Sequence, residues 1–382
     1  MACGLRSGDG PDLGLIVCEG PASAAGVFTT NRVKAAPVLY DVEILARNAA
    51  SIRAIIANAG CANACTGEPG MTATRHTASL VANTLGCPSD QVLVLSTGVI
   101  GRALDMDKIE RGVGNLNSSD AETGGASVAR AIMTTDTKPK TAGEDVTVDG
   151  GVIAIRGIAK GAGMIHPNMA TMLSVITTDA ALPAAALQTA LAAAVGRSFN
   201  CVSVDGDMST NDTVLMLASG ASGVSPTGAG LEAFTAALTR VCTSLARQIA
   251  RDGEGATRLV EIVVSGAADE AEAHTVADSI ARSPLVKTAI HGGDPNWGRV
   301  LAAAGYSGAP IDPDRLSLTF GGGLTLVRDG LPVAFDAAAA SALLKTDPVA
   351  IRLDLGRGSG EATVWTCDFS AEYVAINAHY TT

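Results

Sequence analysis

The chain has 382 residues, of which 47% are hydrophobic and 17% are charged, and this composition excludes an intrinsically disordered protein. Acidic residues outnumber basic ones by 38 to 27, and the net charge of −11 argues against a general nucleic-acid binder, which needs a basic face. Residues 1–10 lack the apolar core of a signal peptide, and no apolar run approaches the roughly 18 residues of a membrane helix, so we expect a cytoplasmic protein with no membrane partner.

The first 170 residues predict short strands mixed with helices, because apolar runs alternate with Gly, Pro, Asn and Asp. Strands are predicted at Leu13–Val17, Ala25–Phe28, Arg53–Ala57, Gln91–Leu95 and Val152–Ile158, and helices at Thr72–Leu85 and Ala121–Met133. The small, polar residues 58–67 predict a loop, and Ser96-Thr97-Gly98 predicts a turn.

The second half continues with the same mixture of elements. Apolar spacing predicts helices at Ala184–Val195, Leu231–Arg251 and Glu270–Ala281 and strands at Met172–Thr178, Val260–Val264, Ala350–Leu355 and Thr363–Phe369, with a hairpin at 315–328 around three glycines. Because strands and helices mix without regular βαβ alternation, we predict an α+β fold. A change of texture places a domain boundary near 255–260, which gives a catalytic region at 1–257 and a C-terminal α+β domain at 258–382.

Common catalytic signatures do not explain the chain. It has no G-x-x-x-x-G-K-[ST] phosphate loop, no H-E-x-x-H and no G-x-S-x-G elbow, and its five histidines are scattered. The eight cysteines form no C-x-x-C pair and no cluster with zinc spacing. We therefore predict no metal site.

The segment Lys160–Ala180, KGAGMIHPNMATMLSVITTDA, offers a different chemistry. A loop with glycine and proline delivers Ala170 and Thr171 to the edge of a strand. A threonine hydroxyl is a weak nucleophile unless a base activates it. Self-cleavage before Thr171 would expose its α-amine, whose pKa of roughly 7.7–8 suits that task. From composition alone, the simpler interpretation is that Thr171 merely begins a buried strand.

The whole chain resembles the ArgJ family, the ornithine acetyltransferases, also called glutamate N-acetyltransferases, of arginine biosynthesis. The cleavage-site segment carries the resemblance together with several blocks in the same order. These blocks are residues 22–38, 58–67, 95–101, 131–137, 209–213, 283–299 (SPLVKTAIHGGDPNWGR) and 373–377. The segment around His291 departs from the family pattern, in which phenylalanine is common.

This resemblance implies a layered α/β/β/α-type sandwich with a smaller C-terminal domain whose tail reaches the active site. It also implies cleavage at Ala170–Thr171 into chains 1–170 and 171–382, which assemble as a heterotetramer of two of each. Thr171 would be the nucleophile, and Thr97 and Gly98 would form the oxyanion hole. Substrate-binding positions fall on Thr137, Lys160, Thr171, Glu254, Asn377 and Thr382.

The implied reaction moves the acetyl group of N-acetylornithine to glutamate through acetyl-Thr171. It needs no bound cofactor, although some family members also use acetyl-CoA as donor. One alternative is a self-processing amidase or aminopeptidase that uses the same nucleophile with water as acceptor. A second is a binding protein that keeps the fold without turnover. The blocks outside the cleavage site, 283–299 above all, favour the transferase.

Overall fold

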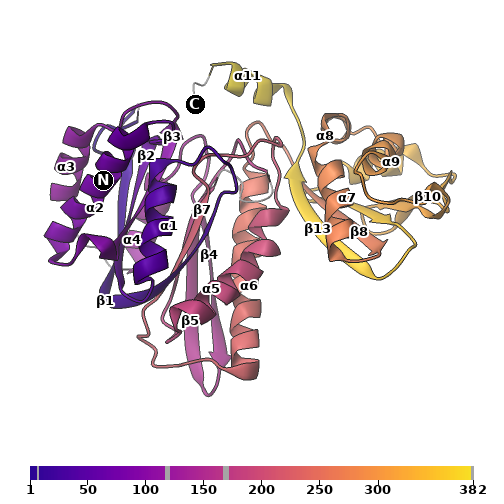
Figure 1. Cartoon of the computed structure of the whole chain (residues 1–382). Coiled ribbons are helices and arrows are strands. Elements are labelled where there is room, and N and C mark those ends of the chain that lie inside the picture. Colours follow the sequence, from indigo (N-terminus) through magenta and orange to yellow (C-terminus); the bar gives the residue numbers. More distant parts are fainter. Residues whose placement is uncertain (7, 117–120, 167–171, 380–382) are drawn as a thin grey trace.

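The computed structural model describes residues 1–6, 8–116, 121–166 and 172–379, without the side chains of 121–123. Figure 1 shows a large lobe that carries the N-terminal two thirds of the chain and a smaller lobe built from later residues. The helices are α1 (Ala36–Asn48), α2 (Gly67–Leu85), α3 (Met106–Gly114), α4 (Ala121–Ala131), α5 (Ala184–Gly196), α6 (Gly228–Arg251), α7 (Glu270–Arg282), α8 (Pro284–Gly292), α9 (Trp297–Gly305), α10 (Ala337–Leu343) and α11 (Ala371–His379).

The strands of the described residues form two sheets, one in each lobe. The large lobe holds β1 (Leu13–Phe28), β2 (Ile52–Cys61), β3 (Val92–Val99), β4 (Lys140–Val148), β5 (Gly151–Lys160), β6 (Leu173–Thr178) and β7 (Thr213–Ala218). The small lobe holds β8 (Leu259–Ala267), β9 (Ser317–Phe320), β10 (Leu324–Arg328), β11 (Leu331–Pro332), β12 (Val349–Asp354) and β13 (Gly360–Cys367).

The large sheet has the order β3-β2-β1-β7-β6-β5-β4. Strand β1 joins its two halves, because its first part pairs with β2 and its last part, from Ser23 to Phe28, pairs with β7. The register shifts between Val17 and Ala22, where the prediction places the gap between two separate strands. The two strands that follow the predicted cleavage site, β6 and β7, therefore lie between strands that precede it.

Helices cover both halves of this sheet. Helices α1 and α2 pack on β2 and β3, whereas α5 and α6 pack on β1, β4 and β5. Side chains from both halves, such as Leu95 and Leu215, belong to one hydrophobic cluster, and Met216 and Phe234 belong to a second cluster under α5 and α6. The α+β class and the layering of helices and sheets are thus confirmed.

The small lobe is built on the sheet β11-β10-β9-β12-β8-β13, with α7 packed against β8 and β13. The first strand of its sheet begins at Leu259, within the region 255–260 where the boundary is predicted. Helix α11 returns from this lobe and lies above the space between the lobes (Figure 1).

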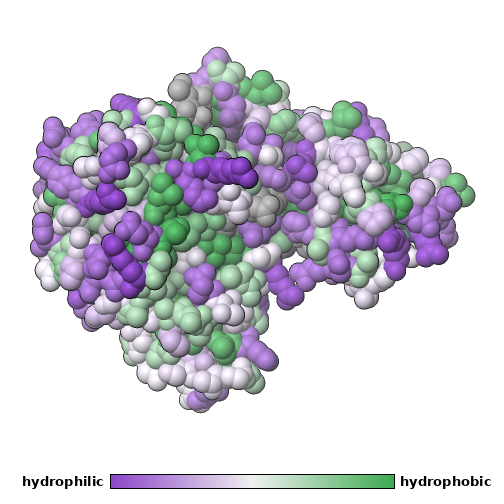
Figure 2. Space-filling model, viewed as in Figure 1, coloured by the Kyte–Doolittle hydropathy of each residue, from purple (hydrophilic) through white to green (hydrophobic). Residues whose placement is uncertain are grey.

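No helix among the described residues is long and apolar enough to span a membrane. Figure 2 shows that hydrophobic residues gather on the face of the large lobe over α1 and α5, whereas the small lobe is mainly hydrophilic.

Candidate active site

A pocket of about 120 Å³ lies where loops of both halves of the large sheet meet the loop after α6 and helix α11. Thr97 and Gly98 of β3, Lys160 of β5, Glu254 after α6 and Asn377 of α11 all line it. These residues are far apart in the sequence, and the fold brings them to one cavity. The pocket therefore unites five of the residues that the sequence singles out.

The other predicted site residues are not among the described residues that line the pocket. Thr137 is exposed and is not part of the pocket wall; its N–H donates to Asp252 Oδ2 (3.0 Å) and its hydroxyl to Asp252 Oδ1. Thr134 and Thr135, a few residues earlier, do line the pocket. The predictions for Ala170, Thr171 and Thr382 lie outside the described residues.

Thr97 and Gly98 lie within strand β3, so the predicted turn at 96–98 is wrong. The strand continues because β3 pairs in parallel with β2, whose own pairing runs to Cys61 and shortens the predicted 58–67 loop. Gly98 has a φ of 130°, and a Cβ there would overlap with the backbone of Gly60. Only glycine fits this close crossing. Thr97, 5% exposed, is held at the same place.

Two buried asparagines fix the end of β3. Asn211 Nδ2 donates to the carbonyl oxygens of Ser96 and Ala62, at 2.7 Å each. Asn58 Oδ1 accepts a hydrogen bond of 2.6 Å from the Ser96 hydroxyl. Because unpaired buried polar groups are costly, these bonds define one backbone position for the residue that precedes Thr97.

Met172 is anchored beside the pocket at both backbone groups. Its N–H donates to Asp212 Oδ1 (3.0 Å), and its carbonyl oxygen accepts from Thr213 N–H (3.1 Å). Asp212 is fully buried, and its Oδ2 has no hydrogen-bond partner among the described residues. Burial raises the pKa of Asp212 well above its ordinary value. The hydrogen bond from the Met172 N–H and the positive charge of Lys160 lower the pKa, but burial has the larger effect. The residue that follows Thr171 is therefore fixed next to the pocket-lining residues 209–211.

Lys160 and Glu254 supply opposite charges to the pocket. Lys160 is 2% exposed, and burial lowers its pKa, although Asp136 opposes the shift. Glu254 is 8% exposed and accepts a hydrogen bond of 2.7 Å from Asn377 Nδ2. A Cβ at Gly163 would overlap with the Glu254 carboxylate. Glycine at this position therefore lets the carboxylate pack directly against the backbone. The pair can recognise the carboxylate and the amino group of a small amino acid.

Asp205 adds a buried carboxyl group to the wall. Its oxygens accept hydrogen bonds from the N–H groups of Met164 (2.6 Å), Ile165 (2.9 Å) and Asp207 (3.2 Å). Burial nevertheless raises its pKa to about 6, because desolvation outweighs these three donors. Asp205 thus fixes the backbone at Met164 and Ile165, shortly before the predicted cleavage site. No group of His, Cys, Asp and Glu in the described part of the chain is arranged to hold a metal ion.

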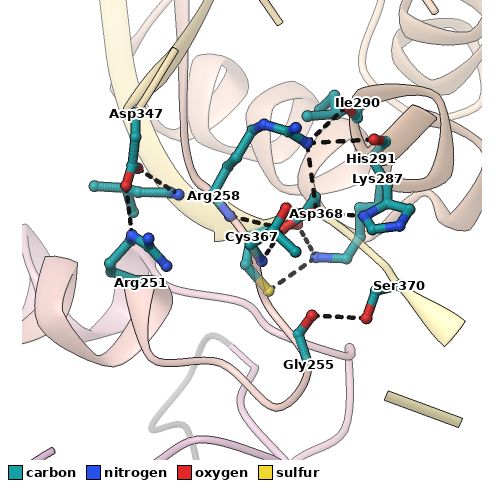
Figure 3. Close-up of polar contacts among 12 residues, drawn as sticks. Arg251, Gly255, Arg258, Lys287, Ile290, His291, Asp347, Cys367, Asp368 and Ser370 are labelled. Atoms are coloured by element: carbon teal, nitrogen blue, oxygen red, sulfur yellow. Dashed lines mark hydrogen bonds and ion pairs between the residues drawn. The ribbon is translucent and has the colours of Figure 1, made fainter. Parts of the chain in front are cut away.

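The segment before α11 is tied to the loop that carries Glu254 (Figure 3). Asp368 accepts from the N–H groups of Thr257 (2.7 Å) and Arg258 (2.9 Å) and lies 2.7 Å from His291 Nδ1. Burial alone would raise the pKa of Asp368, but these partners hold it below its ordinary value. Two residues later, the Ser370 hydroxyl donates to the carbonyl oxygen of Gly255 (2.6 Å). These bonds position α11, and with it Asn377, over Glu254.

Sequence reasoning missed several residues of this site. Asn211 and Asp212 belong to a block that was matched to the family but received no role. Asp136 lies in another such block, residues 131–137, and also received no role, whereas Lys140 lies three residues beyond that block. Tyr373, which lines the pocket, belongs to the matched block 373–377 but received no role, and Asp205 gave no recognisable signal.

Comparison with known proteins identifies the family. The model of the ArgJ family matches residues 1–382. "Arginine biosynthesis bifunctional protein ArgJ" of Symbiobacterium thermophilum is 49% identical over 390 residues, which cover 100% of this chain and 96% of that protein. The protein of the same name from Thermotoga neapolitana is 50% identical, with 97% and 95% covered.

One solved structure shares part of this fold. It is the crystal structure of Arginine biosynthesis bifunctional protein argJ from Bacillus halodurans, with 43% identity and a TM-score of 0.52. The match covers 53% of this chain and 97% of that one. With a family match over its full length and relatives about half identical across it, the chain belongs to the ArgJ family.

Proposed function

We propose that the protein transfers the acetyl group of N2-acetyl-L-ornithine to L-glutamate after cutting itself at Ala170–Thr171. Membership of the ArgJ family makes the chain an acyltransferase of arginine biosynthesis. The observation that best supports the finer assignment is the pocket that unites Thr97, Gly98, Lys160, Glu254 and Asn377.

Cleavage would begin with attack of the Thr171 hydroxyl on the Ala170 carbonyl carbon. The peptide C–N bond then breaks as the acyl group moves to oxygen, and water hydrolyses the ester. The products are a carboxylate at Ala170 and a free amine at Thr171. The anchoring of Met172 by Asp212 and Thr213 supports this step, since it fixes the chain on one side of the bond. The half-length Bacillus halodurans chain is also compatible with two-chain processing.

In turnover, the Thr171 amine takes the proton of its own hydroxyl while the oxygen attacks the acetyl carbonyl carbon. The Thr97 hydroxyl and the Gly98 N–H would stabilise the oxyanion. Ornithine leaves with a proton from the Thr171 ammonium. The glutamate amine then attacks the acetyl ester, which regenerates the Thr171 hydroxyl. Lys160 would hold the substrate carboxylate, and Glu254 with Asn377 would hold an amino group.

The first experiment is intact-mass spectrometry of the wild type, Thr171→Ala and Thr171→Ser. We expect fragments 1–170 and 171–382 from the wild type, slower cutting in the serine variant, and a single 38.3 kDa chain in the alanine variant. A wild type that stays intact and still transfers acetyl groups at full rate would exclude the N-terminal nucleophile.

The acceptor is tested with N-acetylornithine that carries an isotopic label in the acetyl group. Label in N-acetylglutamate supports the transferase, whereas label in free acetate that glutamate does not suppress would favour the amidase alternative. Labelled acetyl-CoA in the same assay tests the second donor. Light scattering of the cleaved protein tests the predicted assembly of two copies of each chain.

A further inference from the structure

A buried lysine lies behind the pocket wall. Lys140, the first residue of β4, is 1% exposed. Its Nζ is 2.6 Å from Asp136 Oδ1 and 2.6 Å from Asp252 Oδ2. Buried charges persist when they are paired and hydrogen-bonded, and a lysine between two carboxylates meets that condition.

The two carboxylates tie together three segments that build the pocket. Asp136 accepts from the N–H groups of Gly161 (2.6 Å) and Thr134 (3.0 Å). Asp252 holds Thr137 by its N–H and hydroxyl and lies two residues before Glu254. The lysine therefore joins the 134–137 loop, the end of β5 and the end of α6.

The two oxygens of Asp136 lie at different distances from the two lysines. Its Oδ1 is 2.6 Å from Lys140, whereas its Oδ2 is 4.0 Å from the Nζ of Lys160. Lys140 thus makes the close, charge-assisted bond, and Lys160 stays at the edge of pairing distance on the pocket wall. Without Lys140, a buried carboxylate would remain uncompensated beside Lys160, and direct pairing with it would be favoured.

We propose that Lys140 is a positioning residue that neutralises Asp136 and so leaves the ammonium group of Lys160 available for the α-carboxylate of the amino-acid substrate. The inference rests on the proposed function, because it concerns how the same pocket recognises its substrate. It assigns to Lys140 no contact with the reacting atoms. A merely structural lysine would instead affect all substrates alike.

The test compares N-acetylornithine with its α-carboxamide, which lacks the carboxylate. The measured quantity is the ratio of kcat/KM for the acid to kcat/KM for the amide. The main variant is Lys140→Met combined with Asp252→Asn, which removes one buried charge of each sign. In it Asp136 keeps only Lys160 as a close cation among the described residues. We expect the ratio to fall by about tenfold or more, while kcat/KM for the amide changes within about threefold.

Matched variants separate this effect from loss of stability. Lys140→Arg keeps the charge and should retain the ratio, as should Asp252→Asn alone, in which Lys140 still pairs with Asp136. Lys287→Met removes another buried lysine, which bonds Thr366 and the carbonyl oxygen of Cys367 in the small lobe. It should lower Tm without changing the ratio. Should the double variant fail to fold, Lys140→Gln carries the same comparison with one hydrogen bond kept.

The outcomes are distinct. The inference is overturned if the folded double variant keeps the wild-type ratio of kcat/KM values. It is also overturned if kcat/KM falls equally for the acid and the amide. A wild-type ratio near one also overturns it, because Lys160 then does not bind the carboxylate. A wild type that transfers no acetyl group overturns the proposed function instead.

Discussion

Two structural constraints, a positive φ and a close contact with the neighbouring strand, require glycine at position 98. Its φ of 130° disfavours any side chain, and a Cβ would overlap with Gly60 on the neighbouring strand. We expect Gly98→Ala to destabilise the protein by about 2–5 kcal/mol, because strain and overpacking add. Thermal unfolding together with acetyl transfer measures the effect.

Gly101→Ala is the control for this prediction. Gly101 has a φ of 75°, but nothing lies within 4 Å of a Cβ built there. We expect a cost of only about 1–2 kcal/mol, from backbone strain alone. Equal losses in the two variants would show that the crossing with Gly60 contributes nothing.

Asp41 makes stability depend on pH. It is fully buried on α1, where Oδ1 accepts from Val94 N–H (2.9 Å) and Oδ2 has no partner among the described residues. Burial raises its pKa well above the ordinary value, so the folded chain binds this proton more tightly than the unfolded chain. The stability that Asp41 contributes is therefore complete below about pH 4 and declines as pH rises above it.

Asp41→Asn should accordingly be more stable than the parent at pH 8, with an advantage that shrinks towards pH 5. Urea unfolding in a Thr171→Ala background, which keeps each protein in one chain, provides the measurement. Glu43→Gln on the same helix, with a half-exposed side chain, should show no such trend. A gap between Asp41→Asn and its parent that is equal at both pH values would contradict the argument.

The resemblance of the sequence to the family predicted the site residues, and the structure brings five of them together in one pocket. It could not predict Asp136, Lys140 and Asp252 as a network. Asp136 lies 4 residues from Lys140 in the sequence, and Asp252 lies 112 residues from it. Only the packing of α6 against β4 brings the three side chains together. A buried charge looks like a surface charge until its partners are known.

At the scale of elements, α11 is held by polar contacts and buries none of its residues. Its place over the pocket depends on the bond from Asn377 to Glu254 and on the bond from Ser370 to Gly255. We expect Asn377→Ala to raise KM by about three- to tenfold, the worth of one hydrogen bond, and to leave Tm unchanged. Val374→Ala, on the same helix at a 62% exposed position, should change neither quantity. A drop in Tm with an unchanged KM would mean that the contact serves stability alone.

Elements with strong periodicity were predicted well. Helix α2 ends at Leu85, where the prediction places its end, because Gly86 adopts the left-handed conformation of a C-cap. The prediction omits β7, TVLMLA, although it is a continuous apolar run and is fully buried. It also splits β1 into two strands, since the residues Cys18–Ala22 look like a turn and yet remain extended between two partners. Pairing across the sheet overrides the local signal there.

At the scale of the whole molecule, the order of the large sheet predicts how the cleaved protein behaves. Strands β6 and β7 lie between β1 and β5, so the two proposed chains alternate within one sheet. They should remain together after cleavage and elute with the volume of the uncut Thr171→Ala protein in size-exclusion chromatography. Only denaturant should separate them, because separation breaks two strand pairings and opens both cores. Two peaks without denaturant would refute this expectation.

The anchor of Met172 has a consequence for the order of events during synthesis. The two groups that bond its backbone, the Asp212 carboxylate and the Thr213 N–H, lie about 40 residues further along the chain. The strand that carries Thr213 must also pair with β1 and β6. While the ribosome still holds these residues, Met172 lacks its anchor, so a nascent chain cannot yet cut itself in the proposed way. The chain would therefore be divided only after translation has passed β7, when both pieces are already interleaved. Late cutting of this kind would spare the cell from assembling two separate fragments.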